Sequence, residues 1–432
     1  MLLVVALLPL GRPGAQGLSA GDRAQLVAML WSDARANFAG WARVRADWDS
    51  ALAASLRAAA LPQSDLVCYR RLRRLVALLD DGQAQVVPPS ALRSRVARPP
   101  LRIASVERRP FVLDYAENDE MRVTRPERLA EILAVQGVAA ESWIADSILP
   151  EIGAASPEAR WERAVTAMLE GEKGTALHLL LRLPGGEQRG ISVTRSVSLN
   201  DRWPLEPPNL QVDSLPDGTV VVRINALADP EVVEQFDRAF PTFGKVRGLI
   251  LDLRGTSGGR PGYAYQILAR LTTAPFPTVL HRTPAYRPGL RVLGRADSAV
   301  TWYAVPPDTI APRSERPAYT GPIALLSSAG TAGAAEDFLA AFRNTSRGVI
   351  VGATSAGSPG EPLDLPLPRS WRFRLSPARD AFPDGTDFSG VGIAPELPAP
   401  QRVSELLVGR DPALERARAH VGAGAGAGAR QE

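Results

Sequence analysis

Two loops that follow apolar strands contain the residue types best suited to binding a reacting carbonyl group. The first loop, residues 252–259, follows the apolar run Leu249–Leu253 and contains the paired glycines Gly258 and Gly259. Glycines allow a backbone N–H to approach a substrate oxygen closely, which is the requirement of an oxyanion hole. This loop therefore predicts an oxyanion-hole-like site at Gly258 and Gly259.

The second loop, residues 327–336, contains small residues that run from an apolar strand into a predicted helix. A helix that begins near Ala334 would present free N–H groups and the positive end of its dipole to an anion. Each loop alone is also typical of an ordinary tight strand-to-helix turn. The two together predict a cradle for a polypeptide carbonyl or terminus, with Ala334 as a further oxyanion-hole-like donor.

Side chains that could act as a base or a metal ligand are scarce. The single cysteine, Cys68, excludes an intramolecular disulfide and a cysteine metal cluster, and its apolar neighbours predict a buried structural thiol on a helix. The three histidines are far apart in the sequence, so neither a metal site nor a cofactor is predicted. The complete supply of basic catalytic candidates is His178, His281, His420, Lys173 and Lys245.

Length and composition indicate a globular protein of two or three domains, with 432 residues of which 45% are hydrophobic. The formal net charge is +4, but 50 basic residues are nearly matched by 46 acidic ones. Because no Lys/Arg run or aromatic-basic stripe occurs, nucleic acid is excluded as a partner. No apolar run of membrane-spanning length follows the N-terminus, so no integral membrane span is expected after processing. The sequence gives no indication of an oligomeric state.

The N-terminal segment, residues 1–17, is typical of a signal peptide. It contains the apolar run Leu2–Leu10, a break at Gly11-Arg12-Pro13, and small residues before a cleavage point after Gly17. The expected location is therefore periplasmic or extracellular. A buried N-terminal strand or helix is the alternative interpretation.

Periodicity divides the rest of the chain into four regions. Residues 18–98 show helical spacing of leucines and end in a strand-like tail, and residues 99–205 change to short strands around one longer helix. Residues 206–402 alternate apolar strands with helices, which predicts a sheet covered by helices. Residues 403–432 predict a helix followed by a disordered low-complexity run at Gly422–Ala429.

In order and spacing, the motifs resemble the tail-specific (C-terminal processing) protease family and its relatives, the tricorn core and the interphotoreceptor retinoid-binding protein. Residues 249–259 resemble its D-L-R-x-N-x-G-G loop, with Thr256 where Asn is usual, and 323–336 its S-A-S-A-x-E helix start. Residues 349–357 resemble I-G-x-x-T-x-G, and 390–396 the closing G-x-G-x-x-P-D. Two earlier matches complete the set of six: Leu30-Trp31 with residues 47–49 and 79–82, and Arg128–Val138 with Gly174–Arg195.

The resemblance implies an α/β fold with a ClpP/crotonase-like core, a PDZ-like β domain over residues 99–205 and a helical N-terminal region. It also implies catalytic positions that this chain fills differently. Gly333 stands where the family has its nucleophilic serine, and Ser358 where Ser-Lys members have the lysine. Gln83 stands for the tricorn-like histidine, and Ser389 for the glutamate before the closing motif. None of these four side chains can attack a carbonyl or accept a proton near pH 7 in the way those positions require.

The expected function is therefore that of an exported serine peptidase homologue that binds peptides or protein termini and is catalytically degenerate. An active serine endopeptidase with a rearranged site remains an alternative. His281 is its most suitable base, although the surrounding residues predict an ordinary surface histidine on a strand. Its possible nucleophiles are Ser327, Ser328, Thr331 and Ser355. A carrier of small apolar ligands is the third alternative, implied by the resemblance to the retinoid-binding relative.

Overall fold

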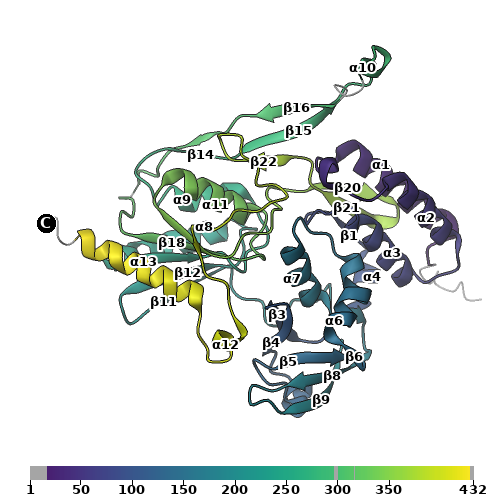
Figure 1. The fold of residues 1–432 in the computed structure, drawn as a ribbon, viewed down its shortest axis with the longest axis horizontal. Coiled ribbons are helices and arrows are strands. Elements are labelled where there is room, and N and C mark those ends of the chain that lie inside the picture. The colour runs from purple at the N-terminus through teal and green to yellow at the C-terminus, as the bar shows by residue number, and fades with distance from the viewer. Residues whose placement is uncertain (1–16, 296–299, 316, 429–432) are drawn as a thin grey trace, which may run out of the picture.

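The computed structural model describes residues 17–295, 300–315 and 317–428. Most of the predicted signal peptide therefore lies outside the described residues. Three parts of the chain gather around a common centre: the N-terminal helices, a small β-rich part below them, and a large sheet flanked by helices (Figure 1).

The N-terminal part contains the predicted helices, each begun by a capping side chain. They are α1 (Ala20–Asn37), α2 (Trp48–Ala60) and α3 (Asp65–Ala77), with N-caps Ser19, Asp47 and Ser64. Cys68 is buried on α3 as predicted, and burial raises the pKa of its thiol to about 11. The short helix α4 (Ser90–Arg93) follows.

The strand-like tail of this part has a partner that the sequence did not indicate. Strand β1 (Gln85–Val87) pairs antiparallel with β21 (Trp371–Leu375), which pairs in turn with β20 (Leu363–Leu367). The N-terminal helices are thus fastened to the C-terminal third of the chain. Residues 82–84, just before β1, are consequently held close to the large sheet.

The β-rich part is an antiparallel sheet in the order β3-β4-β5-β8-β9, with a small strand β6 paired to β5. Strands β8 (Ala176–Arg182) and β9 (Gln188–Thr194) form an antiparallel hairpin, and β8 alternates strictly between exposed and buried positions. The predicted helix is α7 (Pro157–Ala167), which packs on β3 through Trp161 and Val165. The remaining elements are β3 (Leu101–Val106), β4 (Arg109–Tyr115), α5 (Asp119–Thr124), β5 (Glu131–Val135), β6 (Val138–Ala139) and α6 (Ala140–Trp143). A three-stranded sheet beside it contains β2 (Val96–Arg98), β7 (Gly171–Glu172) and β10 (Val197–Ser198).

The large sheet has six strands in the order β11-β12-β13-β18-β19-β23, parallel except for β11. Every position of β13 and β18 is buried, as near-continuous apolar strands require when both faces are covered. Because β13 and β18 are adjacent and parallel, the two glycine-rich loops that follow them emerge at the same edge. The strands are β11 (Leu210–Ser214), β12 (Thr219–Ile224), β13 (Gly248–Asp252), β18 (Ile323–Ser327), β19 (Gly348–Gly352) and β23 (Leu397–Pro398).

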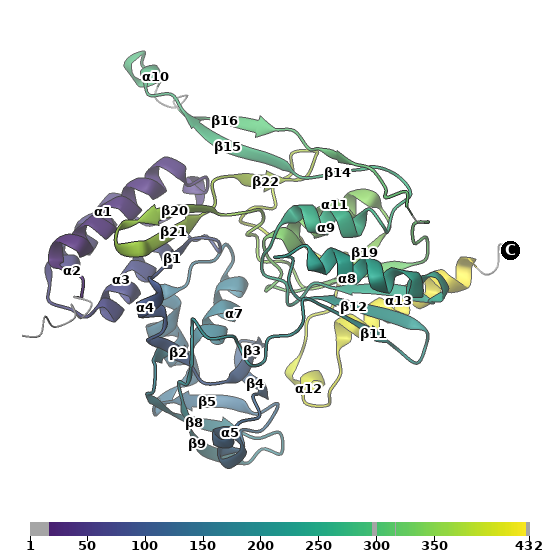
Figure 2. The same ribbon diagram turned by 180° about the vertical axis from the view of Figure 1, so that it is seen from behind.

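Helices cover both faces of this sheet (Figure 2). One face carries α8 (Glu231–Ala239), α9 (Pro261–Leu268) and α11 (Ala334–Thr345), and the other carries α13 (Pro412–Gly428). The predicted disorder of Gly422–Ala429 is wrong where the chain is described, because α13 continues through Gly428. Buried side chains at Ala417 and Val421 anchor the helix to the sheet.

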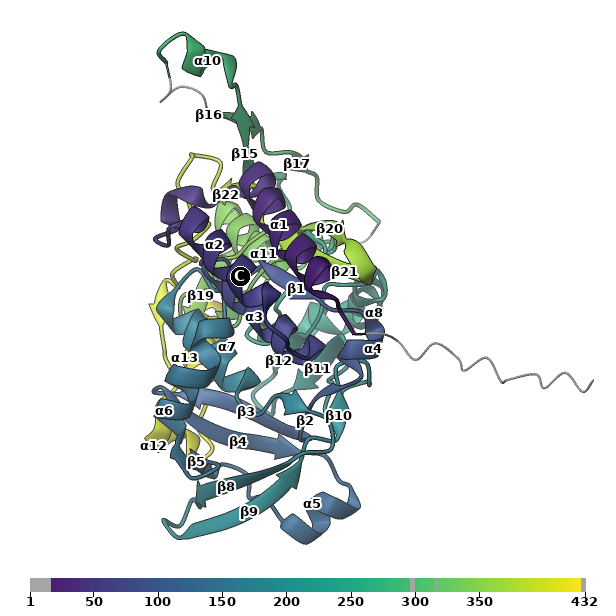
Figure 3. The same cartoon turned by 90° about the vertical axis from the view of Figure 1, so that its right-hand side faces the viewer.

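A long hairpin projects from the large sheet (Figure 3). It consists of β15 (Leu280–Tyr286) and β16 (Val300–Val305), with α10 (Gly289–Val292) near its tip, and β22 (Arg379–Ala381) pairs with its base. The last short elements are β14 (Phe276–Pro277), β17 (Thr309–Ile310) and α12 (Val403–Leu406).

Candidate functional site

Gly333 lies at the N-terminus of α11 and faces two of the other predicted site residues. Its φ of 58° and ψ of −134° lie in a region that L side chains rarely adopt. A Cβ at this position would lie 3.5 Å from Nε2 of Gln83 and 3.7 Å from the backbone nitrogen of Gly258. The structure therefore places a glycine where a side chain would point at both a base position and a backbone donor.

The predicted oxyanion-hole donors differ in their surroundings. Among the described residues, no hydrogen-bond acceptor is placed for the backbone N–H of Gly258 or of Ala334. The N–H of Gly259 also has no acceptor there, but this residue forms a β-bridge with Leu227, and a Cβ at position 259 would collide with the Leu227 backbone. All three predicted donors therefore keep a backbone N–H without an acceptor in the described part of the chain, and the close approach to Leu227 fixes the position of Gly259.

Gln83 bridges the N-terminal part and the core. Its Nε2 donates hydrogen bonds of 3.1 Å to the carbonyl oxygens of both Ser358 and Gly360. Its backbone N–H donates to Asp81, whose carboxylate also accepts from Ser376. Because both hydrogens of the amide are engaged and an amide has no basic nitrogen, Gln83 acts as a clamp between two segments.

Ser358 contributes its backbone to the same junction. Its carbonyl accepts from the N–H of Gly333 at 2.9 Å as well as from Gln83. Its side chain is 5% exposed, and its Oγ has no hydrogen-bond partner among the described residues. Gly333, Gln83, Gly258 and Ser358 are thus brought together as the sequence predicted.

Ser389 is not part of that junction. Its Oγ accepts a 2.6 Å hydrogen bond from the N–H of Asp380, and its carbonyl accepts one from Arg43. The neighbouring Gly390 donates to the carbonyl of Gly357. Ser389 is therefore held by Asp380 and Arg43 and makes no hydrogen bond with Gln83 or Gly333 in the described part of the chain.

Glu336 holds residues 355–358 in place from inside the protein, a role that the sequence did not lead us to expect. The carboxylate is fully buried and accepts hydrogen bonds from Oγ of Ser355 at 2.5 Å and from the N–H groups of Gly357 and Ser358 at 2.7 Å. Burial raises its pKa to about 7. The available signal was a glutamate in the first turn of an otherwise apolar helix, where the helix dipole also favours a negative charge.

A second group of titratable side chains lies behind the same segment. Nδ1 of His281 is 2.5 Å from Oδ1 of Asp380, and this hydrogen bond raises the pKa of the imidazole. Asp337 is fully buried and accepts from the N–H of Gly360 at 3.1 Å, and burial raises the pKa of this carboxyl too. His281 lies on a strand as predicted, but it is half-buried and hydrogen-bonded, so its interpretation as an ordinary surface histidine is wrong.

The possible substitute nucleophiles are all engaged with other groups. Ser327 donates to the carbonyl of Ala353, Ser328 to that of Arg254 and Thr331 to that of Leu253. Ser355 donates to the carboxylate of Glu336. Of the possible bases, His178 and His420 lie on β8 and α13, and Lys173 pairs with Asp201. The Lys245 side chain lies outside the described residues. No hydrogen bond between a substitute hydroxyl and a substitute base occurs in the described part of the chain.

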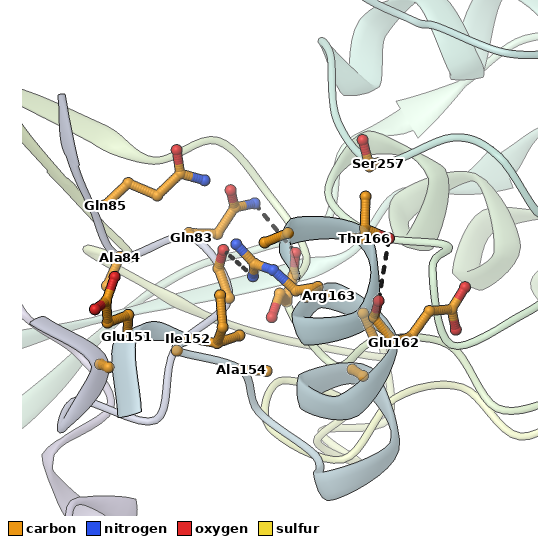
Figure 4. A pocket seen from close by; sticks show the side chains of 18 of the residues that line it. Gln83, Ala84, Gln85, Glu151, Ile152, Ala154, Glu162, Arg163, Thr166 and Ser257 are labelled. Carbon is orange, nitrogen blue, oxygen red and sulfur yellow. Dashed lines mark hydrogen bonds between the residues drawn. The ribbon is translucent and has the colours of Figure 1, made fainter. Parts of the chain in front are cut away.

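A cavity of about 580 Å³ opens beside Gln83 and Ser358 (Figure 4). Its walls come from all three parts of the protein: α3 and residues 82–86, the helix α7, and the loops of the large sheet. Ala332 from the second glycine-rich loop and Ser257 from the first both line it. A ligand in this cavity would therefore lie next to the predicted site.

The described residues lack two features. They contain no group of three or more His, Cys, Asp or Glu side chains arranged to hold a metal ion. None of the helices described is long and apolar enough to cross a membrane.

Comparison with known structures shows the fold. Mature CPAF complexed with lactacystin superimposes with a TM-score of 0.72 over 93% of this chain and 98% of that chain, at 15% identity. A putative peptidase from Parabacteroides merdae gives 0.55 over 94% and 97%, at 16% identity. The photosystem II D1 C-terminal processing protease gives 0.51 over 93% and 97%, at 19% identity. The expected α/β class, with its PDZ-like domain and helical N-terminal region, is confirmed.

Comparison of sequences leads to the same family. The chloroplastic C-terminal processing peptidase of Tetradesmus obliquus is 24% identical over 242 residues, which are 54% of this chain and 48% of that protein. The chain thus spans about half the length of this relative. Residues 218–399, which include both glycine-rich loops, match the model of peptidase family S41. The resemblance to tail-specific proteases is therefore confirmed, with the match to peptidase family S41 confined to the core of this chain.

Proposed function

We propose that this protein is an exported peptidase family S41 homologue that binds peptides or protein termini without hydrolysing them. One observation carries the proposal: a side chain at position 333 would point at both Gln83 and the N–H of Gly258, yet position 333 is glycine. Neither Gly333 nor Gln83 can supply a nucleophile or a base.

The backbone groups and the cavity that remain at this site support peptide binding. The N–H groups of Gly258 and Ala334 have no acceptor among the described residues. Ser257, the neighbour of Gly258, lines a cavity of about 580 Å³. The family acts on peptide or protein substrates, and the PDZ-like sheet offers an edge to which an extended peptide could add. The cavity walls carry charged side chains, including Arg163 and Glu162, which disfavours the alternative of an apolar ligand carrier.

The rearranged-site alternative receives less support. Each substitute hydroxyl donates its hydrogen to a carbonyl or carboxylate oxygen, and His281 is directed at Asp380. A working serine peptidase needs a hydroxyl within about 2.6–3.2 Å of a base.

The test begins with the wild-type protein and an unstructured protein substrate. We expect no cleavage and no labelling by a fluorophosphonate, together with saturable binding of labelled peptides in fluorescence anisotropy. Cleavage by the wild type, or labelling of one serine, would replace the proposal with the rearranged active site. Absence of any peptide binding would contradict the binding function.

Restoring the missing side chains provides the complementary test. The double variant Gly333→Ser with Gln83→His should become reactive to a fluorophosphonate at position 333 above the wild-type background. Gly333→Ala with Gln83→His is the matched control, because it adds the same Cβ and imidazole without a hydroxyl. Equal labelling of the two variants would show that position 333 does not face a reactive site.

Export is part of the proposal and is supported by the apolar run Leu2–Leu10. We expect the mature protein to begin at Leu18, as measured by N-terminal sequencing after expression with its natural N-terminus. An intact Met1 in the mature protein would contradict export through this segment.

A further inference from the structure

The charged side chains in the wall of the 580 Å³ cavity are paired, with two exceptions. Arg73 lies 3.2 Å from Glu170 and 3.8 Å from Glu151, and Arg254 pairs with carboxylates outside the cavity wall. The exceptions are Glu162 and Arg163, neighbours on α7. Within the described part of the chain, neither side chain has an oppositely charged group within 4.0 Å.

Arg163 uses only one edge of its guanidinium. Nη1 donates a 2.6 Å hydrogen bond to the carbonyl of Gly82, and no acceptor for Nε or Nη2 is placed among the described residues. Burial lowers the pKa of Arg163, and the distant charge of Asp81 offsets this only in part while Arg73 adds to it. A cation held out of water without a counter-ion is costly, so an anion at its free edge would be stabilising.

A second donor without an acceptor lies beside Arg163. A Cβ on Gly82 would lie 2.9 Å from Nη1 of Arg163 and closer still to Oγ of Ser358. The two polar atoms therefore face the same small space over Gly82. Ser358 is 5% exposed and its Oγ has no partner among the described residues. The absence of a side chain at position 82 thus gives room to Nη1 of Arg163 and to the hydroxyl of Ser358, while the Nε and Nη2 edge of Arg163 remains without an acceptor.

The geometry of the free edge selects the type of anion. With Nη1 held by Gly82, the Nε and Nη2 hydrogens form the planar fork that matches the two oxygens of a carboxylate. In Figure 4 the guanidinium of Arg163 extends toward Gln83, whereas the carboxylate of Glu162 lies on the other side of α7. Oε1 of Glu162 lies near Gly330, and burial raises its pKa. A carboxylate ligand would be favoured at the Arg163 end of the cavity and disfavoured at the Glu162 end.

We propose that Arg163 binds a carboxylate of the peptide ligand next to Gln83 through the hydrogens on its Nε and Nη2. The carboxylate comes either from the C-terminus of the peptide or from an Asp or Glu side chain within it. This inference rests on the proposed peptide-binding function and adds a chemical requirement to it.

The test uses the full-length protein and three labelled peptides of one sequence. The first has a free C-terminus and acidic side chains, the second has a C-terminal amide, and the third has Asn and Gln in place of Asp and Glu. Fluorescence anisotropy measures the affinity of each for the wild type, Arg163→Gln and Arg163→Lys. Glu162→Gln is the matched control, since it also changes one charge on α7.

Arg163→Gln should weaken binding of the first peptide by about tenfold to a hundredfold, the range expected for hydrogen bonds to a charged group. Arg163→Lys should lie between it and the wild type, because it keeps the charge without the fork. Glu162→Gln should not weaken binding. The peptide whose blocked carboxylate reproduces the loss identifies the source of the carboxylate.

Equal binding of all three peptides to the wild type would overturn the carboxylate site while leaving peptide binding intact. That comparison needs no variant, so it decides the matter even if Arg163→Gln does not fold. If the wild type binds none of the peptides, the proposed function itself fails, and this inference fails with it.

Discussion

Residues 355–360 separate two regions with opposite chemical character. In front of them lie Gly333, Gln83 and the open N–H of Gly258, none of which supplies an acid or a base. Behind them lie Glu336 and the cluster of His281, Asp337 and Asp380, where buried titratable groups hold the segment through hydrogen bonds. The difference teaches that the shape of this cleft depends on the groups behind it, and that the reacting side chains can be absent without loss of the shape.

The largest loss of stability should come from a substitution at Gly352, the last residue of β19. A smaller loss should come from a substitution at Gly333, in front of residues 355–360. Gly352 has a φ of 126°, and a Cβ there would fall on the carbonyl oxygen of Ser327, which cannot move out of the sheet. Gly352→Ala should therefore cost more than about 4 kcal/mol of unfolding free energy or prevent folding. Gly333→Ala should cost about 1–3 kcal/mol, since it meets Gly258 Cα at 3.0 Å and keeps an unfavourable φ. Urea unfolding compares the two variants. A larger loss of stability at position 333 would contradict the conclusion that the cleft is shaped by the sheet and the groups behind residues 355–360.

Replacing Glu336 should have the next largest effect on the free energy of unfolding. Glu336→Ala would leave two buried N–H groups and the hydroxyl of Ser355 without their acceptor, which should cost about 3–5 kcal/mol. Glu336→Gln keeps one acceptor oxygen and should cost less. The measurement is urea unfolding at pH 7. A Glu336→Ala loss below about 1 kcal/mol would show that the front residues, and not Glu336, maintain the segment.

Periodicity was sufficient to predict the elements of the core. The apolar run of β18 and the helix α11 follow the predicted ranges closely, because buried parallel strands read as continuous apolar segments. The meeting of Gly333, Gln83, Gly258 and Ser358 could also be predicted, but only through a resemblance to a family whose motif positions are known.

The missed contacts are those between segments far apart in the sequence. Nothing local indicates that β1 pairs with β21, or that His281 meets Asp380 ninety-nine residues later. Likewise, no pattern shows that Arg163 would lie against Gly82 without a counter-ion. Such contacts depend on tertiary packing, for which residue spacing contains no signal.

The pH dependence of stability should report on the titratable groups behind residues 355–360. The pKa of Glu336 is about 7, above its ordinary value of 4.5, so its contribution is fully present below pH 4.5 and is lost as the pH rises through 7. The raised pKa values of Asp337 and His281 have the same sign. The free energy of unfolding should therefore fall by roughly 3 kcal/mol between pH 5 and pH 8.

Urea unfolding across this pH range measures the slope, and Glu336→Gln is the control that should reduce it. Surface carboxylates with lowered pKa values act in the opposite direction, but Asp22, with a pKa of about 2, titrates well below this window. A stability that rises from pH 5 to pH 8 would mean that the region behind the segment is not buried as described.

The smallest loss of stability should come from replacing Gln83, which lies in front of residues 355–360. Gln83→Ala removes two 3.1 Å hydrogen bonds to the carbonyls of Ser358 and Gly360. Ser358 borders the 580 Å³ cavity and Gly360 borders a second cavity of about 270 Å³, and water can enter both. Since water can replace the amide as a donor, the loss should be about 1 kcal/mol. Gln85→Ala on β1 is the matched control, because no side-chain hydrogen bond of Gln85 occurs in the described chain, and it should be nearly neutral. If Gln83→Ala cost as much as Glu336→Ala, the front region would contribute equally to the frame, and the contrast between the two regions would not hold.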